Sequence, residues 1–231
     1  MIYELQKKVY EANIKLSQSN LVVLSWGNVS QIDRELGLVA IKPSGVAYET
    51  MRVEDIVVVN LEGEVVHGHL KPSVDLETHL ELYKAFPNIK GVTHTHSSVA
   101  TSFAQCEKEI PCFGTTHADH FYGNIVCTRI LRKEEVETNY TKNTGLVIVE
   151  RFRNIDYNSN PGVLVAKHGV FTWGKDALDS VKNAIVIEEC AKMAYQSLVI
   201  DKSISSLPEY ILDTHYNRKH GKKKTYGQEV D

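Results

Sequence analysis

The chain has 231 residues, of which 42% are hydrophobic and 24% charged, which suits one large domain with a packed core. A formal net charge of −3 argues against a nucleic-acid-binding protein, and the basic run Lys222–Lys224 is expected to be a solvated tail. The N-terminus is too polar for a secretory signal, no apolar run reaches about 20 residues, and the four cysteines form no C-x-x-C pair. These features predict a reduced, soluble, cytoplasmic protein.

The first half of the chain predicts two helices and several strands. Apolar residues at spacings of three and four over 2–16 predict a helix with one buried stripe. A strand-like run follows over 21–30, and an alternating strand over 36–45 stops at a Pro-Ser-Gly turn. Residues 55–68 predict a hairpin, and a helix is expected over about 74–86.

The second half continues with short strands and helices. The patterns predict, in order, a strand over 89–97, a helix over 98–104, a short helix from about 134, a strand over 145–150, two strands within 160–174, and helices over 175–199 and 207–219. No repeated β-α-β unit is visible. The order therefore predicts a single α/β domain with a mixed, mostly antiparallel central sheet and helices on both faces.

Two histidines separated by one residue are candidate metal ligands. His94 and His96 lie in the predicted strand over 89–97, where residues two apart point to the same face, so both imidazoles can reach one ion. Two half-buried, hydrogen-bonded histidines would fit the same spacing. His67, His69 and His79 are expected to be exposed or hydrogen-bonded, without a role in function.

His168 favours the metal interpretation. It ends an apolar strand just before Gly169, and three histidines with one open position are a common catalytic zinc arrangement. Asp75, in the first turn of a helix after Lys71-Pro72-Ser73, offers a displaceable fourth ligand. An acidic residue there is also favoured by the helix dipole alone, so the sequence leaves the role of Asp75 open.

Three short segments could hold an anion through their backbone N–H groups. They are Trp26-Gly27-Asn28, Lys42-Pro43-Ser44-Gly45 and Lys71-Pro72-Ser73, and each joins a strand end or helix start to small residues. Taken singly, each is explained as well by an ordinary turn. None matches a glycine-rich nucleotide motif, so nucleotide binding is disfavoured.

Seven motifs occur in an order that spans essentially the whole chain. They are WGNVS (26–30), IKPSGV (41–46), KPSVDLETH (71–79), HTHS (94–97), GTTHADHFYG (114–123), VAKHG (165–169) and HYNRKHG (215–221). Together they closely resemble the L-ribulose-5-phosphate 4-epimerases of the class II aldolase/epimerase superfamily. The resemblance implies a homotetramer that interconverts L-ribulose 5-phosphate and D-xylulose 5-phosphate, at sites between neighbouring subunits.

The resemblance also implies a role for individual residues. It assigns zinc, or another divalent ion, to His94, His96 and His168, with Asp75 at the metal. It assigns the substrate and its phosphate to Gly27, Asn28, Lys42, Ser44, Gly45, Ser73 and Val74. The family usually has a second serine after Ser73, so Val74 keeps a backbone N–H but loses a hydroxyl contact.

Three further residues match the acid/base positions of the family or lie close to them. Asp119 matches one acid/base. Tyr226 matches a second one, which reaches in from the adjacent subunit within a tail of about residues 220–231. His215 lies in a C-terminal stretch that approaches the same site and is a further candidate.

The reaction explains why two proton-transfer groups are needed. The hydrogen on C4 of the ketopentose is not α to the C2 carbonyl, so inversion by simple proton removal is hard. Instead, a base takes the proton of the C4 hydroxyl, and the C3–C4 bond breaks to an enediolate and glycolaldehyde phosphate. The aldehyde then turns and the bond reforms on its other face. Asp119 and Tyr226 are therefore expected on opposite sides of the aldehyde.

Three other interpretations stand beside the epimerase. A class II aldolase, such as an L-fuculose-1-phosphate aldolase, shares the three histidines but has glutamate where Asp75 stands. A metal-free scaffold of the same fold, such as the adducin head domain, would lack the ligands as well as Asp119 and Tyr226. A purely structural zinc site would be cysteine-rich and fully protein-ligated.

Overall fold

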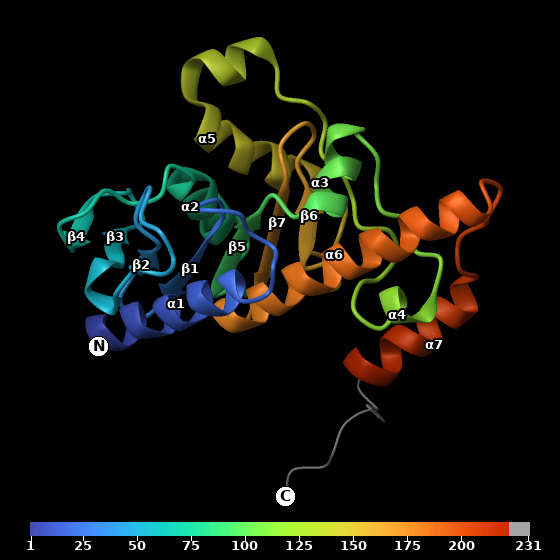
Figure 1. The fold of residues 1–231 in the computed structure, drawn as a ribbon, viewed down its shortest axis with the longest axis horizontal. Helices are drawn as coiled ribbons and strands as arrows, with labels where there is room; N and C mark the ends of the chain where they lie inside the picture. Colours follow the sequence, from blue (N-terminus) through green and yellow to red (C-terminus); the bar gives the residue numbers. More distant parts are fainter. Residues whose placement is uncertain (222–231) are drawn as a thin grey trace, which may run out of the picture.

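The structure is a computed structural model that describes residues 1–221. Its centre is a seven-stranded sheet in the order β4-β3-β2-β1-β5-β7-β6, in which all neighbouring strands are antiparallel (Figure 1). The strands are β1 (Asn28–Asp33), β2 (Leu38–Ile41), β3 (Val57–Asn60), β4 (Val65–His67), β5 (Gly91–Thr95), β6 (Gly162–Leu164) and β7 (Val170–Gly174). The predicted α/β class with a mostly antiparallel sheet is confirmed.

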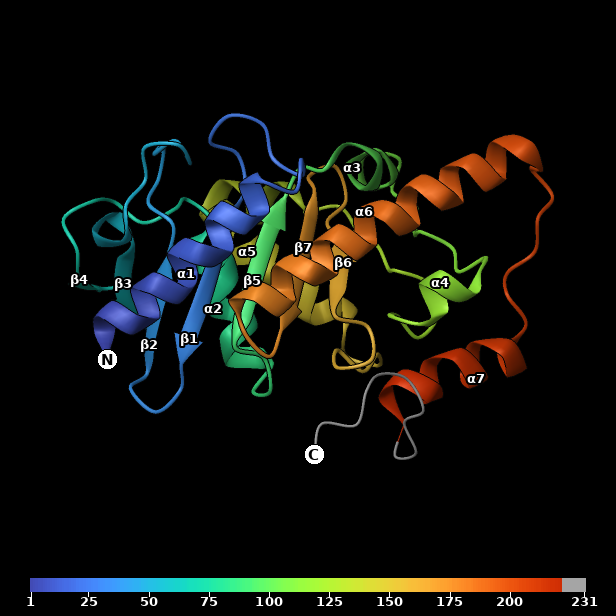
Figure 2. The same cartoon turned by 60° about the horizontal axis from the view of Figure 1, so that its bottom comes forward.

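Helices cover both faces of this sheet. They are α1 (Ile2–Ser17), α2 (Leu76–Ala85), α3 (Ser98–Gln105), α4 (Thr115–Ala118), α5 (Lys133–Arg151), α6 (Ala177–Ile200) and α7 (Glu209–His220), with a 3-10 turn at Val53–Asp55. In Figure 2, α1 and α6 cross one face while α2 and α5 lie behind the other. Within residues 1–221, none of these helices is long and apolar enough to cross a membrane.

Each face of the sheet packs in a hydrophobic core of its own. Along β3, Val57 and Val59 pack with α2 and α5, whereas Val58 packs with α1, as the two-residue period of a strand requires. On α1, Val9 and Leu16 are fully buried, and each contributes about 1.5–3 kcal/mol through its burial. This double layer makes the sheet a rigid support for side chains at its edges.

A buried amide joins α1 to the strand that begins at the site. The Asn13 side chain donates to the carbonyl oxygens of Val9 and Val29 and accepts from the Val29 N–H, at 2.8, 3.1 and 2.9 Å. A buried polar group is tolerated when its hydrogen bonds are made. The start of β1 is therefore fixed from the α1 side.

Two of the expected strands are wrong in part or in full. Residues 21–27 form turns and irregular loop, because Leu24 and Gly27 have φ of 55° and 76°, and only Asn28 onward is strand. Residues 145–150 belong to α5, where Val147 and Ile148 pack in the core beside α2. A short apolar run does not by itself distinguish a buried helix from a strand.

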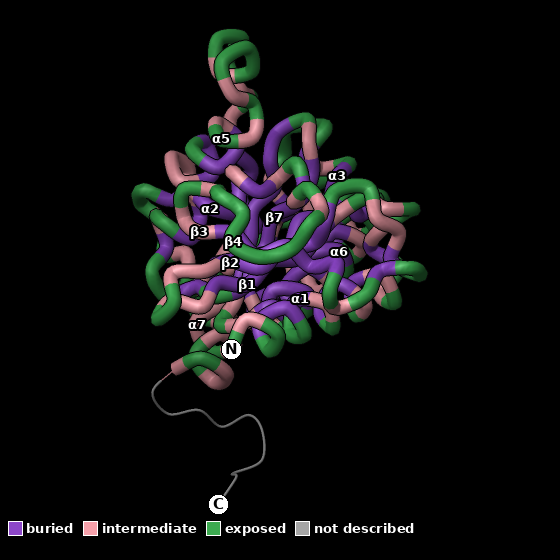
Figure 3. The backbone as a smooth tube through the Cα atoms, turned by 90° about the vertical axis from the view of Figure 1, so that its left-hand side faces the viewer, coloured by how far each residue is buried: buried purple, intermediate pink, exposed green. Residues whose placement is uncertain are grey.

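The C-terminal helix packs at one end of the molecule. α7 lies beside α4, at the end opposite β4 (Figures 1 and 2), and no residue of α7 is buried within the single chain. Figure 3 shows that burial is concentrated in the sheet and in the helices against it. The ends of the fold thus leave surface that the single chain does not cover.

Candidate active site and metal centre

His94 and His96 stand where β5 leaves the sheet. In the sheet register, His94 lies opposite Asn28 of β1 and Phe171 of β7, so these side chains share one face. The His94 ring stacks on Phe171 at 4.1 Å, and His94 Nδ1 donates to the carbonyl oxygen of Val170 at 2.9 Å. Because Nδ1 carries the proton, His94 Nε2 keeps its lone pair, 3.0 Å from His96 Nε2.

His168 reaches the same point from the turn between β6 and β7. The His168 N–H donates to the carbonyl oxygen of Val165 at 3.0 Å, and the Val165 N–H donates to that of Gly169 at 2.8 Å. Glycine is required at 169, because a Cβ there would lie 2.7 Å from the carbonyl oxygen of Thr95. The tight turn therefore packs directly against the strand that carries the other two histidines.

The donor atoms of His94, His96 and His168 lie within 4.8 Å of one another. Burial, and then the neighbouring imidazoles, lower the pKa of His168 to about 3 and that of His96 to about 4. The two rings are therefore neutral at physiological pH, which is the form that binds a metal ion. Three converging imidazole nitrogens fit a divalent metal ion, and the predicted triad is brought together as expected.

Asp75 lines the same cavity from the start of α2. Its Oδ2 accepts a 2.7 Å hydrogen bond from Asn28 Nδ2, which also donates to Ser73 Oγ at 3.0 Å. Burial opposes the charged carboxylate, but the His94 and His79 rings and the Asn28 amide outweigh it and lower the pKa of Asp75. Asp75 is not among the residues whose donor atoms gather within 4.8 Å, so its role as a ligand stays a prediction.

The histidines open into a cavity of about 610 Å³. Most residues that the sequence predicted for the site line this cavity: Gly27, Asn28, Lys42, Ser44, Gly45, Ser73, Val74, Asp75, His94, His96 and His168. A structural zinc ion is normally enclosed by four protein ligands, whereas these histidines face a space large enough for a small substrate.

Two of the predicted anion loops pair with each other. The Ser44 N–H donates to the carbonyl oxygen of Lys71 at 2.9 Å, and the Ser73 N–H donates to that of Lys42 at 3.0 Å. Lys42 Nζ donates to the carbonyl oxygen of Val46 at 2.7 Å, and burial lowers the pKa of this lysine to about 8. Two of the expected anion donors are therefore used within the protein, and Lys42 stabilises the loop that carries Ser44.

Gly27 is the point where the third loop touches β5. It has φ of 76°, and a Cβ there would lie 2.8 Å from both the carbonyl oxygen of His94 and Val22 Cγ1. The Tyr48 hydroxyl donates to the carbonyl oxygen of Gly27 at 2.9 Å. A side chain at this position would push the loop away from the strand that carries the ligands.

The predicted acid/base residues do not line this cavity. Asp119 follows α4, and its carboxylate accepts from His215 at 3.1 Å, Arg218 at 3.0 Å and Lys219 at 3.2 Å, all on α7. Burial raises the pKa of Asp119, but its hydrogen bonds with Arg218, His215 and Lys219 outweigh this and lower it overall. Tyr226 lies outside the described residues. Within the described chain, Asp119 and His215 are thus separate from the metal triad.

Tyr140 and Thr141 line the cavity, although the sequence patterns did not indicate them. The Tyr140 hydroxyl lies 3.3 Å from His168 Nδ1. Both residues follow Asn139, whose φ of −162° and ψ of 92° divide α5 into two helical parts. The signal in the sequence was an asparagine suited to a helix N-cap, because its Oδ1 accepts from the Lys142 N–H at 3.0 Å.

Two buried polar side chains, Glu188 and His79, make hydrogen bonds that stabilise the elements around the site. Glu188 of α6 accepts from the Val99 and Ala100 N–H groups at 3.1 and 2.9 Å, which caps α3 just after His96. His79 is fully buried, with Nδ1 2.7 Å from Ser30 Oγ. The prediction that His79 is a hydrogen-bonded histidine is confirmed.

Comparison with known proteins places the chain in one family. Residues 7–195 match the class II aldolase and adducin N-terminal domain. The chain belongs to this family. It is 51% identical over 225 residues to the L-ribulose-5-phosphate 4-epimerase UlaF of Salmonella paratyphi C, and the match covers 97% of this chain and 99% of UlaF. UlaF of Salmonella typhi gives the same identity and coverage.

A solved structure supports the same fold. The chain superposes on an L-fuculose 1-phosphate aldolase with a TM-score of 0.81 and 24% identity, over 93% of this chain and 95% of the other. This likeness shows the class II aldolase fold alone. The resemblance that the seven motifs carry is confirmed by the UlaF relatives, which match the chain along nearly its whole length.

Proposed function

We propose that the chain is a zinc-dependent L-ribulose-5-phosphate 4-epimerase that interconverts L-ribulose 5-phosphate and D-xylulose 5-phosphate. The observation that carries this proposal is one cavity in which the three histidines face the predicted anion loops. It occurs in a chain 51% identical to epimerases named for this reaction. A cytoplasmic location, predicted from the sequence, stays a prediction.

The metal role follows from the donor set. His94, His96 and His168 offer three imidazoles beside an open cavity, which suits zinc, although other divalent ions accept the same ligands. When bound, the ion supplies Lewis-acid stabilisation of the negative charge that develops on the substrate oxygens. Asp75 lies beside the triad as a further, displaceable ligand.

The protein's own groups hold the phosphate end of the substrate. Because the Ser44 and Ser73 N–H groups are used internally, we assign this role to the Ser44 hydroxyl and to the N–H groups of Gly45 and Val74. These three residues are exposed and line the cavity. A fixed phosphate keeps the aldehyde fragment in place while it turns over.

A second copy of the chain supplies the acid/base groups. We propose a homotetramer of single catalytic domains in which Asp119, His215 and the tail with Tyr226 face the triad of a neighbouring subunit. Their separation from the triad within one chain supports this arrangement. So does the C-terminal half of α6, where Tyr195 is 57% exposed, Val199 63% and Ile200 86%, since such apolar surface usually packs against another chain.

The experiment measures D-xylulose 5-phosphate formed from L-ribulose 5-phosphate by the purified protein, before chelation, after chelation and after zinc is restored. We expect activity before chelation, loss of activity after chelation, and recovery of activity once zinc is restored. Release of glycolaldehyde phosphate without D-xylulose 5-phosphate would favour the aldolase instead. A protein that holds no divalent metal and stays inactive with zinc would favour the scaffold.

A further inference from the structure

The helix α5 is built from two parts that meet beside the metal triad. Asn139 has non-helical φ and ψ, and its Oδ1 caps the second part through the Lys142 N–H. Asn143 Nδ2 donates back to the carbonyl oxygen of Glu135 at 2.8 Å. The first part, residues 133–138, is mostly exposed and projects from the molecule in Figure 3. The joint is thus held by hydrogen bonds from both sides.

The same joint is attached to α2, the helix that begins beside Asp75. Thr78 Oγ1 donates to the carbonyl oxygen of Thr141 at 2.6 Å. Thr141 Oγ1 donates in turn to Glu77 Oε2 at 2.8 Å. Tyr140, which lies between Asn139 and Thr141, is therefore fixed relative to the wall of the cavity.

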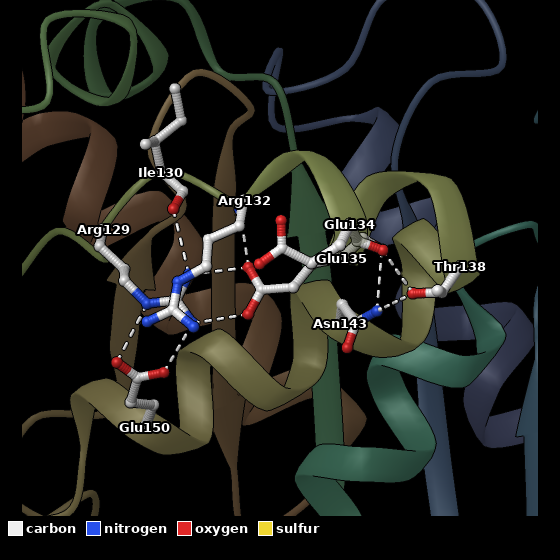
Figure 4. A network of polar contacts seen from close by, with 8 residues as sticks. All are labelled: Arg129, Ile130, Arg132, Glu134, Glu135, Thr138, Asn143 and Glu150. Carbon is white, nitrogen blue, oxygen red and sulfur yellow. Dashed lines mark hydrogen bonds and ion pairs between the residues drawn. The ribbon is translucent and has the colours of Figure 1, made fainter.

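An arginine clamp holds the two parts of α5 together (Figure 4). Arg129 donates through Nε and Nη2 to both carboxylate oxygens of Glu150, at 3.0 and 2.7 Å. Through Nη1 and Nη2 it donates to both oxygens of Glu135, each at 2.8 Å. Glu135 lies in the first part and Glu150 in the second. Paired bidentate contacts of this kind fix geometry as well as add attraction.

Tyr140 is the residue that this joint presents to the triad. Its hydroxyl lies 3.3 Å from His168 Nδ1, and its ring centroid lies 5.8 Å from that of His168. The relationship parallels that of His94, whose Nδ1 donates to a backbone carbonyl. Metal-binding histidines usually donate their second ring N–H in this way, which fixes the ring and its tautomer.

We infer that Tyr140 is a positioning residue for the metal ligand His168, and that the Arg129 clamp positions Tyr140. The phenol oxygen accepts the His168 Nδ1–H, so Nε2 is the nitrogen that offers a lone pair. This inference rests on the metal role proposed for the triad, but not on the reaction. Without the hydroxyl, His168 can turn and change tautomer, and metal binding should weaken.

The test substitutes Tyr140→Phe, which removes only the hydroxyl, and measures the affinity for Co²⁺ by competition with a chelator. We expect roughly tenfold weaker binding and a changed visible spectrum of the bound cobalt. The control is Tyr3→Phe, at an exposed tyrosine of α1, which should bind as the wild type does. Equal affinity and equal spectra for Tyr140→Phe and wild type would overturn this inference but not the proposed function.

A second arm examines the clamp. Arg129→Lys keeps the charge but loses the bidentate geometry, so it should also weaken cobalt binding. If the clamp acts through Tyr140, adding Arg129→Lys to Tyr140→Phe should cause no further loss. Fully additive losses would overturn the role of the clamp. Wild-type protein that takes up no cobalt would overturn the metal site itself, and this inference with it.

Discussion

Asn28 Nδ2 donates a 2.7 Å hydrogen bond to Asp75 Oδ2, from the first residue of β1 to the start of α2. The same amide donates to Ser73 Oγ, so one side chain of β1 holds the segment that carries Ser73 and Asp75. The position of the Asp75 carboxylate is therefore set by the sheet, and the length of its side chain should matter for the reaction.

Asp75→Glu should raise cleavage relative to epimerisation. The extra methylene lengthens the side chain by about 1.5 Å, so the carboxylate no longer fits between Asn28 and the triad. We expect a higher ratio of released glycolaldehyde phosphate to D-xylulose 5-phosphate, measured by two coupled assays on one sample. Asp33→Glu, at the end of β1, is the control and should leave the ratio unchanged. An unchanged ratio in Asp75→Glu would count against the role given to Asp75.

Gly169→Ala should disturb the metal triad and the fold together. The new Cβ would lie 2.7 Å from the carbonyl oxygen of Thr95 and 3.4 Å from atoms of both His94 and His96. Relief of this clash should cost about 1–3 kcal/mol of stability. Urea unfolding of the metal-free protein and chelator competition measure the two effects.

The matched control is Gly114→Ala, because a Cβ at Gly114 would meet no atom within 4 Å. That variant should unfold and bind metal as the wild type does. If Gly169→Ala also behaves as the wild type, the close approach of the β6–β7 turn to β5 does not set the ligand positions.

Most of the fold was predictable because its elements carry clear periodicity. The alternation over 55–68 predicted the β3–β4 hairpin, and the spacing over 2–16 predicted α1. Residues 145–150 were predicted as a strand because their apolar residues are contiguous. Only packing against α2 decides that this run is helical. Residues 21–27 were wrongly predicted as part of a strand. Their apolar side chains are largely exposed, and no local sequence pattern reveals this exposure.

The site was predictable where its residues lie close in sequence or carry a motif. His94 and His96 share a strand, so their convergence follows from strand geometry. Tyr140 was missed because its place beside His168 depends on a helix joint and on long-range contacts with α2. The pairing of Ser44 with Lys71 was missed for the same reason, since it joins two distant loops.

His117 should make stability depend on pH. It is 4% exposed, and burial lowers its pKa from 6.5 to about 4. Below pH 6.5 the unfolded chain takes up a proton that the folded chain does not take until about pH 4. The contribution of His117 to stability should therefore fall by on the order of 3 kcal/mol as the pH drops from 6.5 to about 4. Above pH 6.5 this contribution should stay constant.

His117→Gln removes this titration, so its stability should fall less steeply between pH 6.5 and pH 4 than that of the wild type. The measurement is urea unfolding across that range, with metal-free protein throughout. His67→Gln, at an exposed position of β4, should keep the wild-type slope. Parallel curves for wild type and His117→Gln would show that this histidine is not held neutral.

Mixed tetramers should recover activity if each site uses residues of two subunits. His96→Asn removes a metal ligand, and Asp119→Asn removes a group that lies outside the cavity of its own chain. Each variant alone should be inactive. When equal amounts are unfolded and refolded together, about one site in four combines an intact triad with an intact neighbour, so roughly a quarter of wild-type activity should return.

The same experiment with Tyr226→Phe in place of Asp119→Asn examines the C-terminal tail separately. Recovery with Asp119→Asn but not with Tyr226→Phe would mean that α4 serves the neighbouring subunit while the tail serves its own. Mass spectrometry must show that mixed tetramers form, because inactive mixtures of pure tetramers give no information. Mixed tetramers that form with Asp119→Asn and stay inactive would contradict a shared site, since Asp119 would then have to reach the triad of its own chain by moving away from Arg218 and Lys219.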